Sequence, residues 1–287
     1  MRLGIDIIGN IAILKFDRNA KLRDKKKFAE KLLRSHKQIT SVLEKVGKFS
    51  GRLRTQKTKF LAGEKTKEAL YKENECIFRL NVDSCYFSPR LSSERKEIAG
   101  MVKKGESVLV MFGGIAPYSV VIAKKRKAKK VVSVEIGREC NKYAKINVKR
   151  NKVEDVVELI QGDVRKVFES PFLSTVNSKS SSSLAKRQRV FSVQKKVSLI
   201  KERFDRIVMA RPNLKDSFLD VAFSKIKRNG VIHYYGFYEE KNKSQIKELI
   251  LSEAKKARKE VKILRVKKAG DVGPYRFRYR ADVKVFG

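Results

Sequence analysis

From residue 92 onward, segments with helical periodicity alternate with short apolar segments, and this alternation limits the fold more than any other feature of the sequence. Helices are predicted at 92–103, 117–128, 138–151, 214–227 and 242–258, and strands at 106–112, 130–136, 155–160, 204–209, 230–237, 260–266 and 277–286. Three of the strands, SVLVMF, KVVSVEI and FDRIVMA, are apolar almost throughout, as strands covered on both faces must be. The pattern predicts an α/β fold, with helices on both faces of a mostly parallel sheet.

The first part of the chain predicts a smaller α/β module. Two apolar, β-branched segments, 3–8 and 11–16, flank Gly9-Asn10, a dipeptide typical of hairpin turns. A helix over 20–35 and strands near 40–46, 58–62 and 76–83 complete the module. We therefore predict a small N-terminal α/β domain at residues 1–75 that positions a substrate, and a larger domain at residues 76–287.

The alternation breaks at residues 170–203, where a serine run (180–183) and a cluster of Lys and Arg occur. A serine-rich basic stretch cannot bury enough apolar surface to fold alone, so we expect a flexible insertion. The alternative is an arm that becomes ordered when it contacts RNA.

The charge balance indicates a polyanionic partner. Among the 287 residues, 69 Lys plus Arg face 31 Asp plus Glu, a formal net charge of +38. Each cation placed on a phosphate releases a counterion and so strengthens binding. Nucleic acid is the leading candidate partner.

Cysteine spacing and the longest uncharged segment exclude other classes. Cys76, Cys85 and Cys140 have no CxxC spacing, so we expect reduced thiols and no metal. The uncharged run 107–123 has 17 residues, near the lower limit of a membrane span, but Gly113-Gly114 at its centre indicates a turn. We expect a cytoplasmic protein without a membrane segment.

Polar and glycine residues follow three successive predicted strands. Gly113-Gly114 follows the first, Glu135 ends the second and Gly162-Asp163 ends the third. Ligands of open parallel sheets bind at the carboxyl ends of strands, where an acidic side chain can accept hydrogen bonds from ribose hydroxyls. Because the GxGxxG phosphate fingerprint is absent, the pattern favours S-adenosylmethionine over a dinucleotide. Read singly, Asp163 is as well explained as a helix N-cap.

The chain resembles the archaeal and eukaryotic tRNA (guanine-N1)-methyltransferases that modify the guanosine 3′ of the anticodon, and their relatives in wybutosine synthesis. The motifs that carry the resemblance are IDIIGNIAIL (5–14), GRLRT (51–55), KENECIFRLNVDSCYFSPRLSSER (72–95), GDVR (162–165) and GVIHYYGF (230–237). The resemblance implies a class I (Rossmann-like) methyltransferase fold, S-adenosylmethionine as cofactor and tRNA as substrate. Members act as monomers, and none is implied to need a protein partner.

The resemblance also implies site residues. Glu94 matches the proposed general base that removes the guanine N1 proton, and Arg54 matches the arginine that stabilises charge on O6. Ala210 and Pro212 match the loop that closes over the target base. We predict that the cofactor is bound by Arg90, Phe112, Gly113, Gly114, Glu135, Ile136, Asp163 and Val164.

Simpler roles remain open for these residues on sequence alone. Glu94 could serve as an i to i+4 ion-pair partner, Arg54 as a plain phosphate contact and Arg90 as a salt-bridge residue. The chain also departs from the family pattern, with Val110 where members usually carry Asp and Ala210 where they carry Asn. Members also carry a small domain ahead of the IDIIGN strand, and without it we expect more reliance on charge.

Three functions therefore remain. The first is methyl transfer to N1 of guanosine 37 in tRNA. The second is a wybutosine-pathway reaction, either aminocarboxypropyl transfer or methylation of a tricyclic intermediate. The third is a catalytically degenerate tRNA-binding protein.

Overall fold

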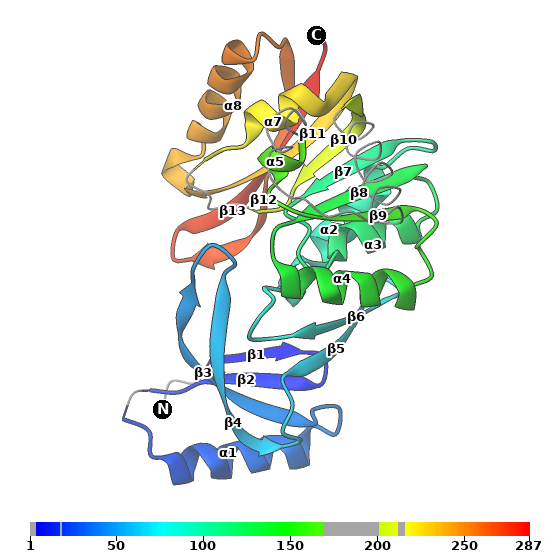
Figure 1. The fold of residues 1–287 in the computed structure, drawn as a ribbon. Helices are drawn as coiled ribbons and strands as arrows, with labels where there is room; N and C mark the ends of the chain where they lie inside the picture. The colour runs from blue at the N-terminus through cyan, green and yellow to red at the C-terminus, as the bar shows by residue number, and fades with distance from the viewer. Residues whose placement is uncertain (1–3, 18, 169–200, 212–215) are drawn as a thin grey trace, which may run out of the picture. The chain divides into compact units, whose positions relative to one another are not determined.

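The computed structural model describes residues 4–17, 19–168, 201–211 and 216–287, in two compact units. Unit 1 comprises Met1–Lys104 and Gly113–Ile160, and unit 2 comprises Gly105–Phe112 and Gln161–Gly287 (Figure 1). The predicted α/β class is confirmed by the helices and strands of both units. Residue 75 lies in the turn between two paired strands of unit 1, and the domain division there stays a prediction.

Unit 1 begins with a four-stranded sheet in the order β1-β2-β3-β4. Its elements are β1 (Gly4–Ile8), β2 (Ile11–Lys15), α1 (Leu22–Ser35), β3 (Ser41–Ser50) and β4 (Thr55–Gly63). The predicted Gly9-Asn10 hairpin is present, with β1 antiparallel to β2. Helix α1 packs on this sheet through Ala29 and Leu32, which join Leu14, Val42 and other residues in one buried apolar cluster.

A two-stranded ribbon, β5 (Glu68–Glu73) and β6 (Cys76–Asn81), follows. Its turn residues Asn74 and Glu75 have positive φ angles of 47° and 61°, as a type I′ hairpin turn requires. The sequence analysis did not predict β5. The turn at 74–75 lacks the glycine that usually marks such hairpins, and the strand carries charges at both ends.

The remaining elements of unit 1 are α2 (Ser92–Met101), α3 (Pro117–Lys124), β8 (Lys130–Glu135), α4 (Arg138–Arg150) and β9 (Val157–Gln161), together with the 3₁₀ turn η1 (Pro89–Leu91). Helix α4 holds the ribbon through two buried asparagines. Asn147 accepts from the Arg79 N–H (2.7 Å) and donates to the Arg79 carbonyl (3.1 Å). Asn151 makes the same pair of bonds with Ile77, both 2.8 Å long.

The described residues of unit 2 contain five strands in the order β12-β13-β11-β10-β7. Its elements are β7 (Ser107–Met111), α5 (Val164–Phe168), β10 (Phe204–Met209), α7 (Leu219–Lys225), β11 (Ile226–Glu239), η3 (Glu240–Asn242), α8 (Gln245–Lys256), β12 (Val261–Gly273) and β13 (Arg276–Val285). Strand β10 is parallel to both β7 and β11, whereas β13 is antiparallel to β11 and β12. Parallel pairing among the central strands agrees with the prediction.

The strands of unit 2 enclose a buried polar network. His233 is fully buried, and its Nδ1 lies 2.6 Å from Asp282 Oδ1 while its Nε2 lies 2.7 Å from Arg206 Nη1. Burial lowers the pKa of His233 despite the neighbouring carboxylate. A neutral imidazole that donates from Nδ1 and accepts from Arg206 at Nε2 satisfies both contacts. His233 of β11 thus connects β10 and β13 through one buried polar network.

The predicted helix 214–227 is shorter than expected. Helix α7 begins at Leu219, because the Asp216 carboxylate accepts the Phe218 N–H (3.0 Å) in a turn that places Phe218 at φ 55°. The chain then enters β11 directly at Ile226. Most of the predicted insertion, 170–203, lies outside the described residues, as does Pro212. Among the described residues, no helix is long and apolar enough to cross a membrane.

Candidate functional site

A tight glycine turn follows strand β7. A Cβ atom on Gly113 would lie 2.2 Å from Ser133 Oγ, so only glycine fits without displacing that buried serine. Gly114 has φ 58°, and a Cβ atom there would meet no atom of the described residues within 4 Å. The turn therefore presents bare backbone beside open space, the arrangement that lets a ligand approach the main chain closely.

The Glu135 carboxylate is fixed by two backbone amides. Its Oε2 accepts the Gly114 N–H (2.9 Å) and its Oε1 accepts the Gly137 N–H (2.6 Å). Glu135 is 9% exposed. Because each carboxylate oxygen has a second lone pair, both can still accept from a ligand hydroxyl. We call Gly113, Gly114, Glu135 and Gly137 the glycine–carboxylate cradle; Ile136, between the last two, is partly exposed.

The tip of the β3–β4 hairpin lies at the cradle. A Cβ atom on Gly137 would be 3.4 Å from Leu53 Cδ2, which places the loop before β4 against the glycine. The next residue, Arg54, has φ 52°, and its guanidinium carbon lies 4.0 Å from the centre of the Tyr86 ring. Stacking on an aromatic face favours a cation and fixes its direction. The structure therefore brings the Arg54 loop and the cradle together within unit 1.

Glu94 lies in the first turn of α2 and is 6% exposed. The next residue, Arg95, forms a two-bond ion pair with Glu73, and the side chains of both are 2% exposed. Arg95 also donates to the Ser88 carbonyl (3.1 Å) and lies 4.9 Å from the Phe87 ring centre. This pair fixes the start of α2 and the YFSPRL segment, and with them the position of Glu94.

Arg90 points elsewhere in this structure. Its side chain is 75% exposed and its Nη2 lies 2.7 Å from Asp6 Oδ1 on β1. This ion pair agrees with the salt-bridge role that the sequence analysis kept as the alternative for Arg90. Its predicted role at the cofactor stays a prediction.

The predicted site residues of unit 2 form a second group. The rings of Phe112 and Phe218 meet edge to face at 5.1 Å, and the Arg165 guanidinium lies 4.7 Å from the Phe218 ring centre. The Asp163 carboxylate accepts the Arg165 N–H (3.0 Å), so it caps α5 as its simpler reading expects. Val164 is buried and Ala210 is partly exposed.

Two site residues were missed by the sequence analysis. Gly137 closes the cradle, and Leu53 places the Arg54 loop against it. Gly137 follows Glu135 at the junction of a strand and a helix, a signal that the sequence does contain. Leu53 had no such signal, because a lone apolar residue in a basic loop resembles a chance surface residue.

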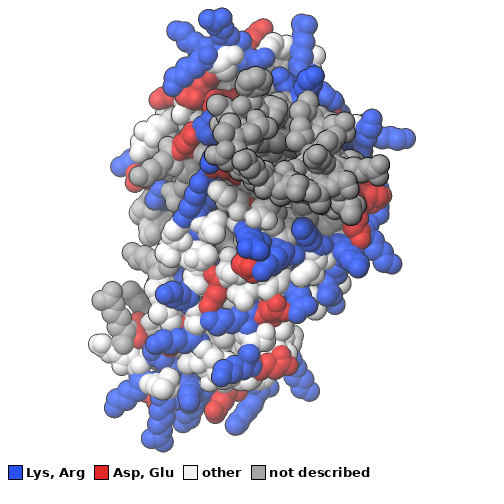
Figure 2. All heavy atoms as spheres, in the orientation of Figure 1, with Lys and Arg blue, Asp and Glu red and all other residues white. Residues whose placement is uncertain are grey.

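Lys and Arg side chains are abundant at the surface, and the cysteines are buried thiols. Figure 2 shows Lys and Arg side chains spread widely over the visible face. All three cysteines are free and buried, and burial raises the pKa of Cys76 to about 11, which keeps this thiol protonated. Within the described ranges, no three His, Cys, Asp or Glu side chains are grouped as metal ligands.

Comparisons with known proteins give a consistent result. The TRM5/TYW2 methyltransferase domain matches residues 69–179 and 182–264, and the TYW2 N-terminal domain matches residues 4–66. The tRNA (guanine(37)-N(1))/4-demethylwyosine(37)-methyltransferase Taw22 of Nanoarchaeum equitans is 34% identical over 307 residues, covering 98% of this chain and 99% of that protein.

Solved structures extend the comparison. Trm5b of Pyrococcus abyssi, a tRNA (guanine(37)-N(1))-methyltransferase, is 34% identical over 81% of this chain and 59% of that protein. Its crystal structure matches with a TM-score of 0.79 and 31% identity, over 99% of this chain and 75% of that one. P. horikoshii TYW2, solved with MeSAdo, has a TM-score of 0.74, covers 99% of this chain and 90% of that one and, at 24% identity, shows likeness of fold.

Proposed function

Because the chain belongs to the TRM5/TYW2 methyltransferase family, we propose that it transfers a methyl group from S-adenosylmethionine to N1 of guanosine 37 in tRNA. The observation that carries the proposal is the placement of the Arg54 loop, through Leu53, against the cradle that contains Glu135. A cation for the target base and an acceptor for a nucleoside cofactor are thereby adjacent within one unit. We further propose that the protein acts as a cytoplasmic monomer, with residues 1–75 positioning the tRNA.

The cradle fits the proposed cofactor. The fixed Glu135 carboxylate can accept both ribose hydroxyls, and the open space beside Gly114 admits an adenosyl group against the backbone. Phe112, Ile136, Asp163 and Val164 are proposed to complete the site around the base. When bound, S-adenosylmethionine supplies an electrophilic methyl group.

The reaction then needs a base and a cation. Glu94 is proposed to accept the guanine N1 proton, so that the N1 lone pair can form the new N–CH₃ bond. Negative charge develops on O6 as that proton leaves, and the Arg54 guanidinium, oriented by Tyr86, stabilises it. The target base must leave its stack to reach this site. Ala210 and Pro212 are proposed to close over it.

A wybutosine-pathway reaction is the second candidate. The match of residues 4–66 to the TYW2 N-terminal domain favours it, and the name of the N. equitans relative contains both guanosine and 4-demethylwyosine methylation. The third candidate, a catalytically degenerate tRNA-binding protein, is favoured by Val110, which is buried in β7, and by Ala210, because the family pattern has polar groups at these two positions.

Mass analysis of nucleosides separates the candidates. Pure protein is incubated with S-adenosylmethionine and either unmodified tRNA or tRNA that carries the tricyclic base 4-demethylwyosine at position 37, and the masses of the digested nucleosides are measured. A methyl increment on guanosine supports the proposal, whereas an increment on the tricyclic base alone assigns the second candidate. No increment on either tRNA indicates a binding protein without catalysis.

The role of Glu94 is tested by Glu94→Gln. Loss of a general base lowers turnover by about 10²- to 10⁴-fold, while tRNA affinity should stay at the wild-type value. Glu97→Gln, on the same helix, is the matched control and should retain turnover. Equal turnover in the two variants would remove Glu94 from the mechanism.

A further inference from the structure

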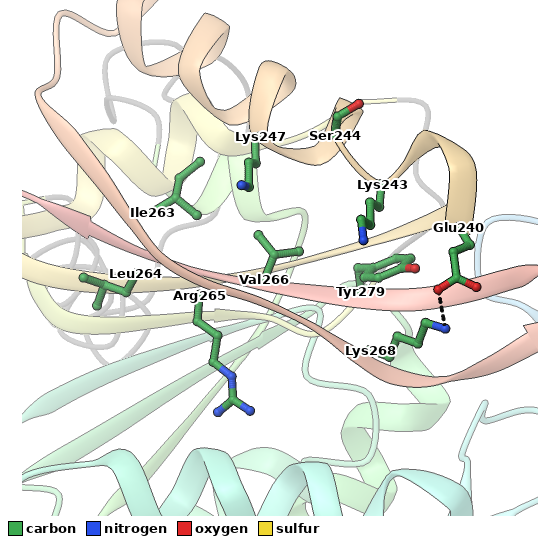
Figure 3. A pocket seen from close by; sticks show the side chains of 10 residues that line it. All are labelled: Glu240, Lys243, Ser244, Lys247, Ile263, Leu264, Arg265, Val266, Lys268 and Tyr279. Carbon is green, nitrogen blue, oxygen red and sulfur yellow. Dashed lines mark ion pairs between the residues drawn. The ribbon is translucent and has the colours of Figure 1, made fainter.

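A cavity of about 560 Å³ opens in unit 2 beside the start of α8 and strand β12 (Figure 3). Its size falls within the range of roughly 300–1,000 Å³ typical of ligand sites. The residues that line it are Glu240, Lys243, Ser244, Lys247, Ile263, Leu264, Arg265, Val266, Lys268 and Tyr279. We call this the basic cavity. None of its residues belongs to the candidate site described above.

The lining is strongly cationic. Lys243, Lys247, Arg265 and Lys268 contribute four positive charges against the single carboxylate of Glu240. Glu240 and Lys268 pair at 2.8 Å, and that pairing lowers the pKa of Glu240. Positive charge therefore exceeds negative charge even after this pair has formed, and the excess favours an anionic ligand.

Tyr279 supplies an independent observation. The residue is 3% exposed, and its hydroxyl is buried without a hydrogen-bond partner among the described residues. In Figure 3 the hydroxyl points toward the side of the cavity where Glu240 and Lys268 meet. A buried hydroxyl without a partner destabilises the fold, and a phenylalanine would avoid this cost. A ligand oxygen that displaced the neighbouring long side chains would satisfy the hydroxyl.

The rest of the lining suits a nucleotide unit rather than a bare anion. Ser244 precedes the first residue of α8, where the helix dipole is positive, and its side chain makes no capping hydrogen bond within the part of the chain that the structure describes. Ile263, Leu264 and Val266 add an apolar wall from β12. Phosphate oxygens would meet the cations, while a ribose would rest on this wall.

We propose that the basic cavity binds a backbone phosphate of the substrate tRNA, together with its ribose, through Lys243, Lys247 and the Tyr279 hydroxyl. The inference rests on the proposed function, because it names a contact of the same substrate away from the methyl-transfer site. The charge of the cavity and the +38 net charge of the chain both complement RNA.

The salt dependence of tRNA affinity tests the charges. The double variant Lys243→Gln/Lys247→Gln should reduce the slope of log affinity against log salt by about 1, because the two lysines are proposed to neutralise one phosphate and each neutralised phosphate contributes about 1. The control Lys255→Gln/Lys262→Gln changes the same charge on α8 and β12 at exposed residues outside the cavity. A control slope that falls as far as the cavity slope would overturn the proposal.

Tyr279→Phe tests the hydroxyl without changing charge. We expect tRNA affinity to fall roughly 3- to 10-fold, while the melting temperature stays equal or rises, since only an unsatisfied group is removed. Unchanged affinity would contradict the proposal. Weaker binding of inorganic pyrophosphate with unchanged tRNA affinity would assign the cavity to a free phosphate ligand instead.

These measurements keep the two proposals separate. If the wild-type protein neither binds nor modifies tRNA, the proposed function fails. If it does both and the cavity variants match their control, only the cavity inference fails.

Discussion

Charged side chains are buried around the candidate site of unit 1, whereas they are exposed in the basic cavity of unit 2. Around the candidate site, Glu135, Glu94 and Arg95 are buried, and the contacts of Glu135 and Arg95 are short bonds to backbone groups or to one opposite charge. In the basic cavity, Lys243 and Lys247 are exposed and sit on long, flexible side chains.

The difference follows from what each site is proposed to bind. Methyl transfer needs one donor and one acceptor held in a single geometry, so its charges must be fixed before the ligand arrives. A phosphate of a flexible polyanion needs only a favourable potential, which exposed lysines supply without exact placement. Single substitutions should therefore have large effects around the candidate site and small, graded effects at the cavity.

The largest effect is expected from Arg95→Met. It leaves the Glu73 carboxylate buried without its partner, which costs about 3–5 kcal/mol of unfolding free energy. Urea denaturation measures the loss. Arg126→Met is the matched control, because its pair with Asp155 is about half exposed and is worth about 1 kcal/mol or less. Similar losses of unfolding free energy in the two variants would contradict the proposed difference between buried and exposed charges.

Glu135→Gln should follow in size. The amide nitrogen of Gln cannot accept the N–H of Gly114 or Gly137, so one donor loses its partner at a cost of about 1–3 kcal/mol. Affinity for S-adenosylmethionine, measured by calorimetry, should fall at least about tenfold. Glu139→Gln, on the exposed first turn of α4, should leave both quantities unchanged.

A smaller effect is expected from pH. The pKa of folded His233 lies below that of the unfolded chain, so the unfolded state takes up the proton first as the pH falls below about 6.5. Stability from the neutral imidazole is thus present above that pH and is lost below it, by at most about 1.4 kcal/mol per pH unit. Unfolding curves at pH 7.5 and 5.5 test this, and His233→Gln should flatten the difference while His36→Gln should not.

The smallest effect is expected from Lys243→Gln measured as stability. An exposed lysine contributes within about 0.5 kcal/mol, so thermal unfolding should match the wild-type curve even though tRNA affinity weakens. A large stability loss here would show that the cavity is a structural feature and would erase the contrast with Arg95.

The sequence predicted best where a local pattern decides the structure. The Gly9-Asn10 turn, the apolar strand at 107–111 and the acidic strand end at Glu135 are all formed by local signals that the structure confirms. The prediction fell short where tertiary contacts decide. Strand β12 was expected to end at 266 but extends to Gly273, because its polar outer half pairs with β13 rather than forming a loop.

In the candidate site, too, local features could be predicted and tertiary contacts could not. The residue types at the cradle could be predicted from the sequence. The contact of Leu53 with Gly137 could not, because it joins residues 84 positions apart and neither local sequence indicates it. The ion pair of Arg90 with Asp6 is similar, since no spacing relates the two residues. Tyr279 could not be singled out either, because an aromatic residue in an alternating strand resembles ordinary core.

The two asparagines of α4 have a further effect on how the chain behaves in concentrated solution. A two-stranded ribbon normally exposes unpaired N–H and C=O groups along each border, and such a border recruits strands from other molecules. Asn147 and Asn151 occupy those groups at Arg79 and Ile77, so that this border of β6 offers no template. The side chains of a helix thereby protect the protein against self-association through the ribbon.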